Sequence, residues 1–532
     1  MAVSGRRFTQ SVLTAPKWGY FSAYDVLASV PQLEFHKMLG AWEFHSQLAK
    51  AYNDSPTGWL TPASVFGKLW AAAYADALAI RWAAHGPTSA RPGSGPPLVV
   101  YELGAGAGHT GAAFADRLRA SWPALYKRLE YITVEVSPRL ADTQRQTMAA
   151  AGHAKKHRVI QADAVELHAV HSDDRPCTVL AFELLDNLPH DKFVQRGSIP
   201  AQCLDHAGAV IPASAGSMSI PVSLQSCARA GEAAMHSEAA WRQCFVQPTA
   251  GSASAALASG DDGDAAWTEV YAQGADVQDP WAVAALGAVL QRGQCERASA
   301  SASAGAGGNG ADPDILDQLP TQQLASSATD WLTTARNWLW PAQDPAAQDA
   351  WRAKAISNAQ ALWVPTGAMQ LLASVHTALP QSSVLAVDFS WLPGRNMPRR
   401  SPSDVARVIA AHSKPTHAAV PESITEGAPL VVSKHPGETE GNAAVTIEHE
   451  HWLSPAPLGC ADIYFPVDWP ALAGAAQGVW HGADVAVSPL STWLDQHAPR
   501  VVEHAKTLTG WNPMLHSYSN VRVLDIRASP RQ

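Results

Sequence analysis

The residues best suited to chemistry lie in one glycine-rich stretch, LVVYELGAGAGHTG, at positions 98–111. Its apolar start is rich in β-branched residues, which is typical of a buried parallel strand. The glycines that follow allow a tight turn and a close approach of the backbone to a ligand. Residues 112–120 are good helix formers, so the turn opens onto a helix N-terminus, whose free amides bind anions or polar groups. The stretch therefore predicts a cradle for a nucleotide-type ligand.

Two ligands fit this glycine pattern. Gly106, Gly108 and Gly111 match the spacing of a dinucleotide-binding loop, and Glu135 lies 24 residues further on, near the distance expected for a ribose-binding acid. Sites for S-adenosylmethionine (SAM) use a related loop, an acid followed by alternating glycines, which here runs from Glu102 to Gly108. They also place an acid at the end of the second strand, again Glu135. The glycine run alone does not separate these interpretations.

Later strand ends favour SAM. Asp163 follows the predicted third strand, where SAM enzymes often place an acid beside the adenine amino group; a surface acid in a turn is the alternative. Glu183 ends the predicted fourth strand and Asp186 follows it, at the kind of strand end where open α/β sheets carry out chemistry. His190, in the same loop, could act as a general base. A histidine in such a loop is more often a hydrogen-bonding partner, which is the role we predict for it.

Length and composition narrow the class of protein. The chain has 532 residues, enough for several domains or one elaborated α/β domain, and its net charge of −9 gives no support for nucleic-acid binding. Its six cysteines form no CxxC pair, so neither a zinc site nor a disulfide framework is indicated. No apolar run approaches the ~18 residues of a membrane span. The first 24 residues carry Arg6, Arg7 and Lys17 and no acid, as both mitochondrial presequences and ordinary basic N-termini do.

The elements that must position these residues alternate between strand and helix from residue 98 onward, which predicts a parallel sheet with crossover helices. Four early strands and up to three of the later ones would form one sheet of about seven strands. The predicted strands are 98–103, 130–136, 157–161, 177–182, 383–389, 429–433, 483–487 and 521–526. The predicted helices include 111–128, 138–151, 468–475 and 490–508, one from Thr61 to Trp82, and helices between 330 and 372.

Four regions follow from this pattern. Residues 1–97 form a helical N-terminal region that contributes to a substrate groove and starts with the presequence-like segment, and 98–196 form the first part of the core. Residues 197–330 are an insertion, largely low-complexity, with an ordered piece near 267–291. Residues 331–532 hold helices and the remaining strands that complete the core.

The motifs, taken in order, resemble those of a known family. They are PKWGYFS (16–22), YELGAGAGHTG (101–111), TVEVSPRLADTQ (133–144), FELLDNLPHDKF (182–193), LAVDFSWLPG (385–394), ADIYFPVDWPAL (461–472) and GWNPMLHSYSNVRVLDI (510–526). The family is that of the MidA-type methyltransferases, which include the mitochondrial complex I assembly factor that methylates arginine. The resemblance implies a Rossmann-like, seven-stranded α/β fold of the SAM-dependent methyltransferases, here with a helical N-terminal region and long low-complexity insertions.

The resemblance also implies roles for individual residues. Glu183 and Asp186 match the two acids of the family's E-x-x-D-x-x-P segment, and Pro189 matches its proline. The implied cofactor residues are Glu102 near the methionine amino group, the turn glycines Gly104, Gly106 and Gly108, Glu135 at the ribose hydroxyls and Asp163 near the adenine.

A pair of carboxylates at this position suits arginine chemistry. A guanidinium, whose pKa is above about 12, is a poor nucleophile while it is protonated. Glu183 and Asp186 could bind two of its nitrogens, orient its plane and stabilise the charge that builds during methyl transfer. The alternative is that Asp186 caps a turn and Glu183 only braces the cofactor loop.

By resemblance we expect protein-arginine N-methylation of a complex I subunit in the mitochondrial matrix, with SAM as the cofactor and no metal, nucleic acid or membrane span. Two alternatives stay open, a methyltransferase for another substrate and a SAM-binding assembly chaperone or scaffold without turnover. An NAD-binding enzyme is a distant third. The sequence predicts neither the oligomeric state nor which arginine is modified.

Overall fold

The computed structural model describes residues 3–24, 33–54, 59–85, 96–195, 218–236, 241–248, 267–271, 279–291, 361–390, 425–426, 428–435, 445–449, 452–453 and 461–528. The predicted helices between 330 and 360 lie outside the described residues, as does most of the predicted insertion. Among the residues in these ranges, no helix combines the length and the apolar character needed to cross a membrane.

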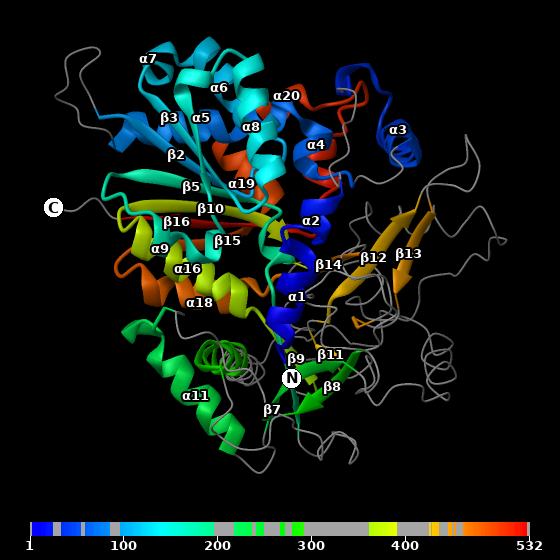
Figure 1. Cartoon of the computed structure of the whole chain (residues 1–532). Coiled ribbons are helices and arrows are strands. Elements are labelled where there is room, and N and C mark those ends of the chain that lie inside the picture. The colour runs from blue at the N-terminus through cyan, green and yellow to red at the C-terminus, as the bar shows by residue number, and fades with distance from the viewer. Residues whose placement is uncertain are drawn as a thin grey trace, which may run out of the picture.

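A seven-stranded sheet forms the centre of the molecule, as predicted (Figure 1). In spatial order its strands are β15 (Asp484–Pro489), β16 (Val521–Arg527), β10 (Ser382–Phe389), β5 (Cys177–Phe182), β2 (Leu98–Leu103), β3 (Leu129–Glu135) and β4 (His157–Gln161). Strand β16 runs antiparallel to both of its neighbours, and the other pairs are parallel. Because β2, β3, β4 and β5 are parallel, the turns that follow them meet at one edge of the sheet.

Successive residues of the five inner strands point to opposite faces of the sheet and join two separate cores. Val100 and Leu180 pack into one core, which also holds Trp70. Their neighbours Val99 and Val179 pack into the other. Burial on both faces explains why these strands are apolar along nearly their whole length.

Helices cover both faces of the sheet (Figure 1). One core includes α5 (Lys68–His85), α6 (His109–Ser121), α8 (Pro138–Ala150), α19 (Leu490–His497) and α20 (Pro499–His504). The other includes α9 (Leu167–Val170), α16 (Thr366–Ala378) and α18 (Trp469–Val479). The predicted helices 111–128 and 490–508 are each split, because Pro123 starts the short α7 (Pro123–Tyr126) and Pro499 starts α20. A further short helix, α21 (Pro513–His516), precedes β16.

The described part of the N-terminal region is mostly helical, but the helix predicted from Thr61 to Trp82 is broken. The region contains α1 (Gly5–Thr14), α2 (Tyr20–Ala23), α3 (Ala41–Asp54) and α4 (Pro62–Phe66) before α5. Thr61 caps α4 by accepting a hydrogen bond from the backbone N–H of Ser64. The prediction of one helix from Thr61 to Trp82 is wrong, because Gly67 has a φ of 48° and ends α4 one residue before α5 begins.

Two smaller sheets accompany the main one. The first, in spatial order, contains β1 (Val3–Ser4), β7 (Trp241–Pro248), β6 (Asp191–Gln195), β9 (Ala361–Val364) and β11 (Thr425–Glu426), with β8 (Trp267–Tyr271) also paired to β7. The second contains β13 (Val445–His449), β12 (Leu430–His435) and β14 (Asp462–Tyr464). Two predictions are corrected here. The strand predicted at 429–433 belongs to β12, outside the main sheet, and 361–364, predicted as helix, is β9 because it pairs with β6.

The predicted insertion contributes more described elements than the single piece expected near 267–291. Besides β7 and β8 it holds α11 (Gln225–His236) and a helix at 280–291. These two helices cross at very close range, since a Cβ on Gly287 would lie 1.8 Å from the carbonyl oxygen of Cys227. The crossing therefore needs glycine for space and not for an unusual φ.

Replacing Gly111 with alanine is expected to destabilise the fold by about 1–3 kcal/mol. A Cβ there would lie 2.7 Å from Cε1 of the buried Tyr131 ring and 3.3 Å from a carboxylate oxygen of Glu102. The matched control is Gly474→Ala in α18, where a Cβ would meet nothing within 4 Å and alanine should stabilise the helix by up to about 1 kcal/mol. Denaturant unfolding measures both changes; a Gly111→Ala variant as stable as Gly474→Ala would contradict this packing.

Candidate active site

One cavity opens where the parallel strands of the main sheet end. Its volume of about 730 Å³ is in the range of cofactor sites. Its walls come from the turns after β2, β3, β4 and β5 and from α1, α4 and β14. Seven of the eight predicted site residues line it, namely Glu102, Gly104, Gly106, Glu135, Asp163, Glu183 and Asp186.

The glycine turn after β2 has the backbone geometry that its composition predicts. Gly104, Gly106 and Gly108 have φ angles of 64°, 53° and 80°, values that L side chains rarely adopt. Gly108 is the predicted site residue that does not line the cavity. It lies at the N-terminus of α6, where a Cβ would come within 3.1 Å of the Cα of Gln144. Its role in this structure is to let the turn pack against α8.

Two buried carboxyl groups flank the glycine turn. Glu102 accepts a hydrogen bond from the Tyr131 hydroxyl at 2.8 Å, and Glu135 accepts one from the backbone N–H of Ser137 at 2.9 Å. Burial raises the pKa of Glu102 and of Glu135 to about 7. Both groups therefore change charge near neutral pH.

Gln144 joins the glycine turn to the end of β3. This residue was not predicted from the sequence. Its side-chain amide donates to the carbonyl of Gly106 at 2.9 Å and to the carboxylate of Glu135 at 3.0 Å. It is fully buried on α8, on the same helix face as Leu140 and Met148. A polar residue at an apolar position of a helical pattern is the signal that could have indicated it.

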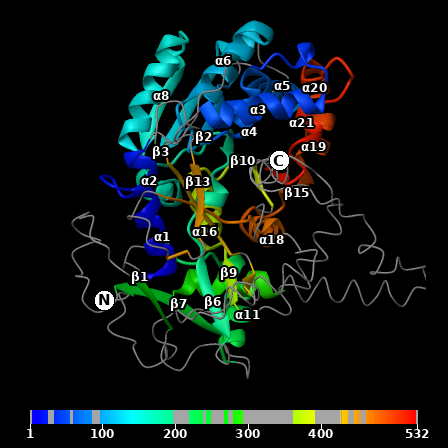
Figure 2. The ribbon, with the colours of Figure 1, turned by 90° about the vertical axis from the view of Figure 1, so that its right-hand side faces the viewer.

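Asp163 lies in the turn after β4, where the sequence places it. One of its carboxylate oxygens accepts a hydrogen bond from the backbone N–H of Val165, and the other accepts one from the side chain of Gln10 at 2.9 Å. Gln10 belongs to α1, which runs from the sheet of β6 and β7 toward α2 and α8 (Figures 1 and 2). Gln10 could not be predicted from the sequence, because 153 residues separate it from its partner.

The two predicted catalytic acids lie in one tight turn after β5. Glu183 has a φ of 50°, the one positive φ of a non-glycine residue in the described ranges, and backbone strain of this kind clusters at functional sites. Asp186 is 2 % exposed, and its Oδ1 has no hydrogen-bond partner among the described residues. Burial, and after it neighbouring carboxyl groups, raise the pKa of both acids well above the usual range.

Two further buried acids surround this turn. Asp388, at the end of β10, accepts hydrogen bonds from the backbone N–H groups of Leu185 at 2.7 Å and of Asp186 at 3.2 Å. Asp462, in β14, accepts one from the Asn187 side chain at 3.0 Å. Burial raises the pKa of Asp388 and of Asp462 to about 7. With Glu183 and Asp186, four carboxyl groups therefore cluster at one end of the site, an arrangement that favours a cationic ligand.

His190 has the structural role that we predict from its loop position. Its ring stacks on Phe465 with centroids 4.1 Å apart, and its Nδ1 lies 2.9 Å from the carbonyl oxygen of Leu188. It is not among the residues that line the cavity. In the described part of the chain, no group of three or more His, Cys, Asp or Glu side chains is arranged to hold a metal ion.

Comparison with known proteins identifies the family. A family model described as "Putative S-adenosyl-L-methionine-dependent methyltransferase" matches residues 75–418, more than half of the chain. The chain belongs to this methyltransferase family. SAM is therefore its cofactor, and the dinucleotide interpretation of the glycine turn is set aside. The match also supports the resemblance to the MidA-type methyltransferases.

Two crystal structures of proteins from Burkholderia thailandensis are similar to this methyltransferase. One, of a superfamily member bound to S-adenosyl-homocysteine, is 14% identical with a TM-score of 0.48, and the alignment covers 99% of this chain and 89% of that chain. The other, of an uncharacterized protein of the same superfamily, is 14% identical with a TM-score of 0.44, covering 99% and 88%. No curated protein matches the chain.

The chemistry of the cavity residues in this methyltransferase fits SAM. Gly104 lines the cavity with its backbone, and a Cβ there would lie 3.0 Å from the Leu184 side chain. Glu135 would offer carboxylate oxygens as acceptors for ribose hydroxyls, and Glu102 would offer them to an ammonium group. When bound, the cofactor supplies an electrophilic methyl group on a sulfonium cation.

We expect SAM to bind this methyltransferase more tightly as the pH rises from 6 to 8, by about tenfold. Glu102 and Glu135 line the cavity and each have a pKa of about 7, and their ionised forms would accept hydrogen bonds from SAM and attract its positive charge. Binding near pH 7 should therefore release protons. Calorimetry in buffers of different ionisation enthalpy measures that release, and Glu135→Gln should reduce it. Equal affinity at both pH values with no proton release would contradict the prediction.

Proposed function

We propose that this methyltransferase methylates arginine side chains, as a protein-arginine N-methyltransferase. The observation that carries the proposal is Asp186, a carboxyl group that is 2 % exposed, lines the cavity and has an Oδ1 without a hydrogen-bond partner among the described residues. After burial, its pKa is raised by Asp388, Asp462 and Glu183, so a bound cation would relieve a repulsion that already exists.

The shape of a guanidinium suits this acidic end better than the shape of an ammonium group does. Its five N–H donors lie in one plane and can bond to two carboxylates at once. Trp59 and Tyr464 also line the cavity, with ring centroids 6.0 Å apart. A flat cation packs well against aromatic rings, so these two residues would hold the arginine side chain beside the acids.

Glu183 and Asp186 would act on the substrate. The attacking arginine nitrogen loses one proton as it bonds to the methyl carbon, and a carboxylate oxygen of Glu183 or Asp186 would accept that proton. The raised pKa of these two acids suits them to this acceptance. Hydrogen bonds to the remaining nitrogens would orient the guanidinium and stabilise its charge.

On the cofactor side, the proposal assigns three acids. Glu102 binds the methionine amino group, Glu135 binds the ribose hydroxyls and Asp163 lies beside the adenine. Their support is the family resemblance together with their position on the cavity wall.

The proposal includes a protein substrate and a location. The MidA-type resemblance supports a subunit of complex I as the substrate and the mitochondrial matrix as the compartment. The net charge of −9 agrees with a protein substrate in preference to a nucleic acid.

A label-transfer experiment tests the function. The enzyme is incubated with methyl-tritiated SAM and complex I subunits from cells depleted of SAM, and the products are hydrolysed to amino acids. We expect labelled methylarginine with the wild-type enzyme and at most about 1% of it with the isosteric variant Glu183→Gln. Label in another amino acid would show that this amino acid, and not arginine, accepts the methyl group. SAM binding with no transfer to any subunit would favour a scaffold without turnover.

A further inference from the structure

Helix α1 forms one wall of the cofactor cavity. Its residues that face the cavity are Arg6, Arg7, Gln10, Leu13 and Thr14. Their spacing of one, three and four positions places them on one side of a helix. A segment at the start of the chain therefore takes part in a site whose other lining residues, apart from Phe21, come from Trp59 onward.

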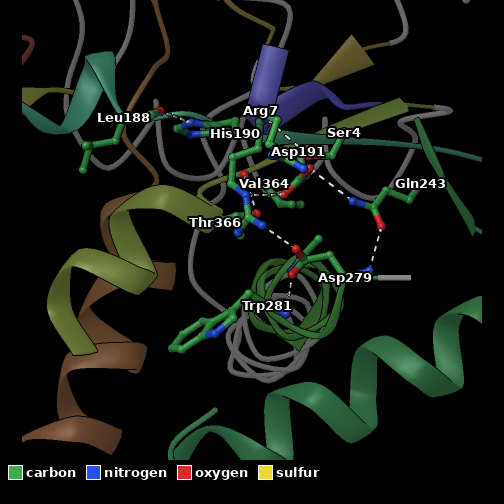
Figure 3. Close-up of polar contacts among 12 residues, drawn as sticks. Ser4, Arg7, Leu188, His190, Asp191, Gln243, Asp279, Trp281, Val364 and Thr366 are labelled. Carbon is green, nitrogen blue, oxygen red and sulfur yellow. Dashed lines mark hydrogen bonds and ion pairs between the residues drawn. The ribbon is translucent and has the colours of Figure 1, made fainter. Parts of the chain in front are cut away.

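The N-terminal end of α1 is fixed to the first small sheet. Strand β1 pairs with β7, and the buried guanidinium of Arg6 forms an ion pair with Asp279 and lies 3.8 Å from Asp191. Gln243 bridges these two acids (Figure 3), donating to Asp191 at 3.1 Å and accepting from the backbone N–H of Asp279 at 3.2 Å. This end of the helix is therefore held by several buried polar contacts.

The middle of α1 is joined to the adenine side of the cavity by one hydrogen bond. Gln10 donates to one oxygen of Asp163 at 2.9 Å, and the backbone N–H of Val165 donates to the other at 3.0 Å. With both oxygens bound, the carboxylate cannot rotate freely. Each oxygen still has a second lone pair for a ligand. Gln10 thus controls the direction in which Asp163 presents its remaining acceptors.

We propose that Gln10 is a positioning residue for adenine recognition. It holds the Asp163 carboxylate where that group accepts a hydrogen bond from the adenine 6-amino group, and it closes α1 over that end of SAM. The inference rests on SAM as the cofactor and on the adenine role of Asp163. It does not depend on arginine as the substrate.

Calorimetric binding of two ligands tests the proposal without a methyl acceptor. S-adenosylhomocysteine carries the 6-amino group, and S-inosylhomocysteine carries an oxygen in its place. We expect the wild-type enzyme to prefer the adenosyl ligand by at least about tenfold. In Gln10→Ala the adenosyl ligand should bind about tenfold more weakly while the inosyl ligand changes little, so the preference is largely lost.

Controls separate this role from support of the fold. Ser11→Ala changes a residue of α1 that does not line the cavity, and it should leave both affinities unchanged. If Gln10→Ala does not fold, the isosteric Gln10→Glu removes the same donor and should show the same loss of preference. The proposal is overturned if the variant retains wild-type affinity for the adenosyl ligand, or if it loses affinity for both ligands by the same factor.

Discussion

Asp186→Asn is expected to lower the rate of methyl transfer by about 10²–10³-fold and, at the same time, to make the protein more stable at pH 8. In the proposed mechanism the rate falls because asparagine can neither accept the proton of the attacking nitrogen nor balance the charge of the guanidinium. The stability rises because the wild-type carboxyl is buried beside Asp388, Asp462 and Glu183, which disfavour its ionised form. We expect SAM affinity to stay within about threefold, a change of under about 1 kcal/mol.

The size of the stability change depends on pH. Because the pKa of Asp186 is raised in the folded state, the folded protein holds this proton more tightly than the unfolded chain does. The free energy of unfolding therefore falls as the pH rises from the ordinary aspartate pKa of about 4 to the raised pKa of the folded protein. Below about pH 4 this loss of stability vanishes. The gain from Asp186→Asn should be about 1–3 kcal/mol at high pH and near zero at pH 4.

Thermal unfolding and the rate of S-adenosylhomocysteine production measure the two effects of Asp186→Asn. The control is Asp142→Asn, which changes an exposed acid on α8 outside the cavity and should alter neither quantity. A variant that transfers methyl groups within about threefold of the wild-type rate would show that Asp186 is not catalytic. A lower melting temperature of the variant at pH 8 would show that the ionised carboxylate of Asp186 does not destabilise the folded protein.

Asp388→Ala is expected to cost about 2–4 kcal/mol of folding stability. Asp388 is fully buried and accepts hydrogen bonds from three backbone N–H groups, those of Leu185, Asp186 and Phe389. Alanine would leave all three donors buried without an acceptor. Two of them belong to the turn that carries the proposed catalytic acids, Glu183 and Asp186, so methyl transfer should fall as well.

The matched variant for this site is Asp388→Asn. Its amide oxygen can still accept from Leu185 and Asp186, and only the contact with Phe389 is lost, so the cost should be about 1 kcal/mol. Urea unfolding of the wild type and the two variants measures their folding stabilities, which should decrease from the wild type to asparagine to alanine. If alanine were tolerated as well as asparagine, the hydrogen bonds of Asp388 could not be what holds the turn.

The sequence predicts those parts of the site that depend on local signals. The glycine turn, the strand ends at Glu135 and Glu183, and Asp163 are recognisable because an apolar strand stops at a polar or glycine residue. In a parallel sheet such ends meet at one edge, so the topology brings them together without further information. The seven strands of the main sheet follow from the same pattern.

Residues from distant segments could not be predicted in this way. Asn187 contacts Asp462 across 275 positions, and Gln10 contacts Asp163 across 153. Neither contact has a local signal, because the spacing around each residue is that of an ordinary loop or helix. Strand β9 was expected as helix for a related reason, since its pairing with β6 overrides the local pattern.

The measurement that tests the central claim most directly is calorimetric titration of SAM and of NAD into the wild-type protein and into Glu135→Ala. If the cavity at the ends of β2, β3 and β5 is the cofactor site, SAM should bind with a micromolar Kd and NAD should not bind. Loss of Glu135 should then weaken SAM binding by about 1–3 kcal/mol. Absence of SAM binding, or unchanged affinity in Glu135→Ala, would contradict the account.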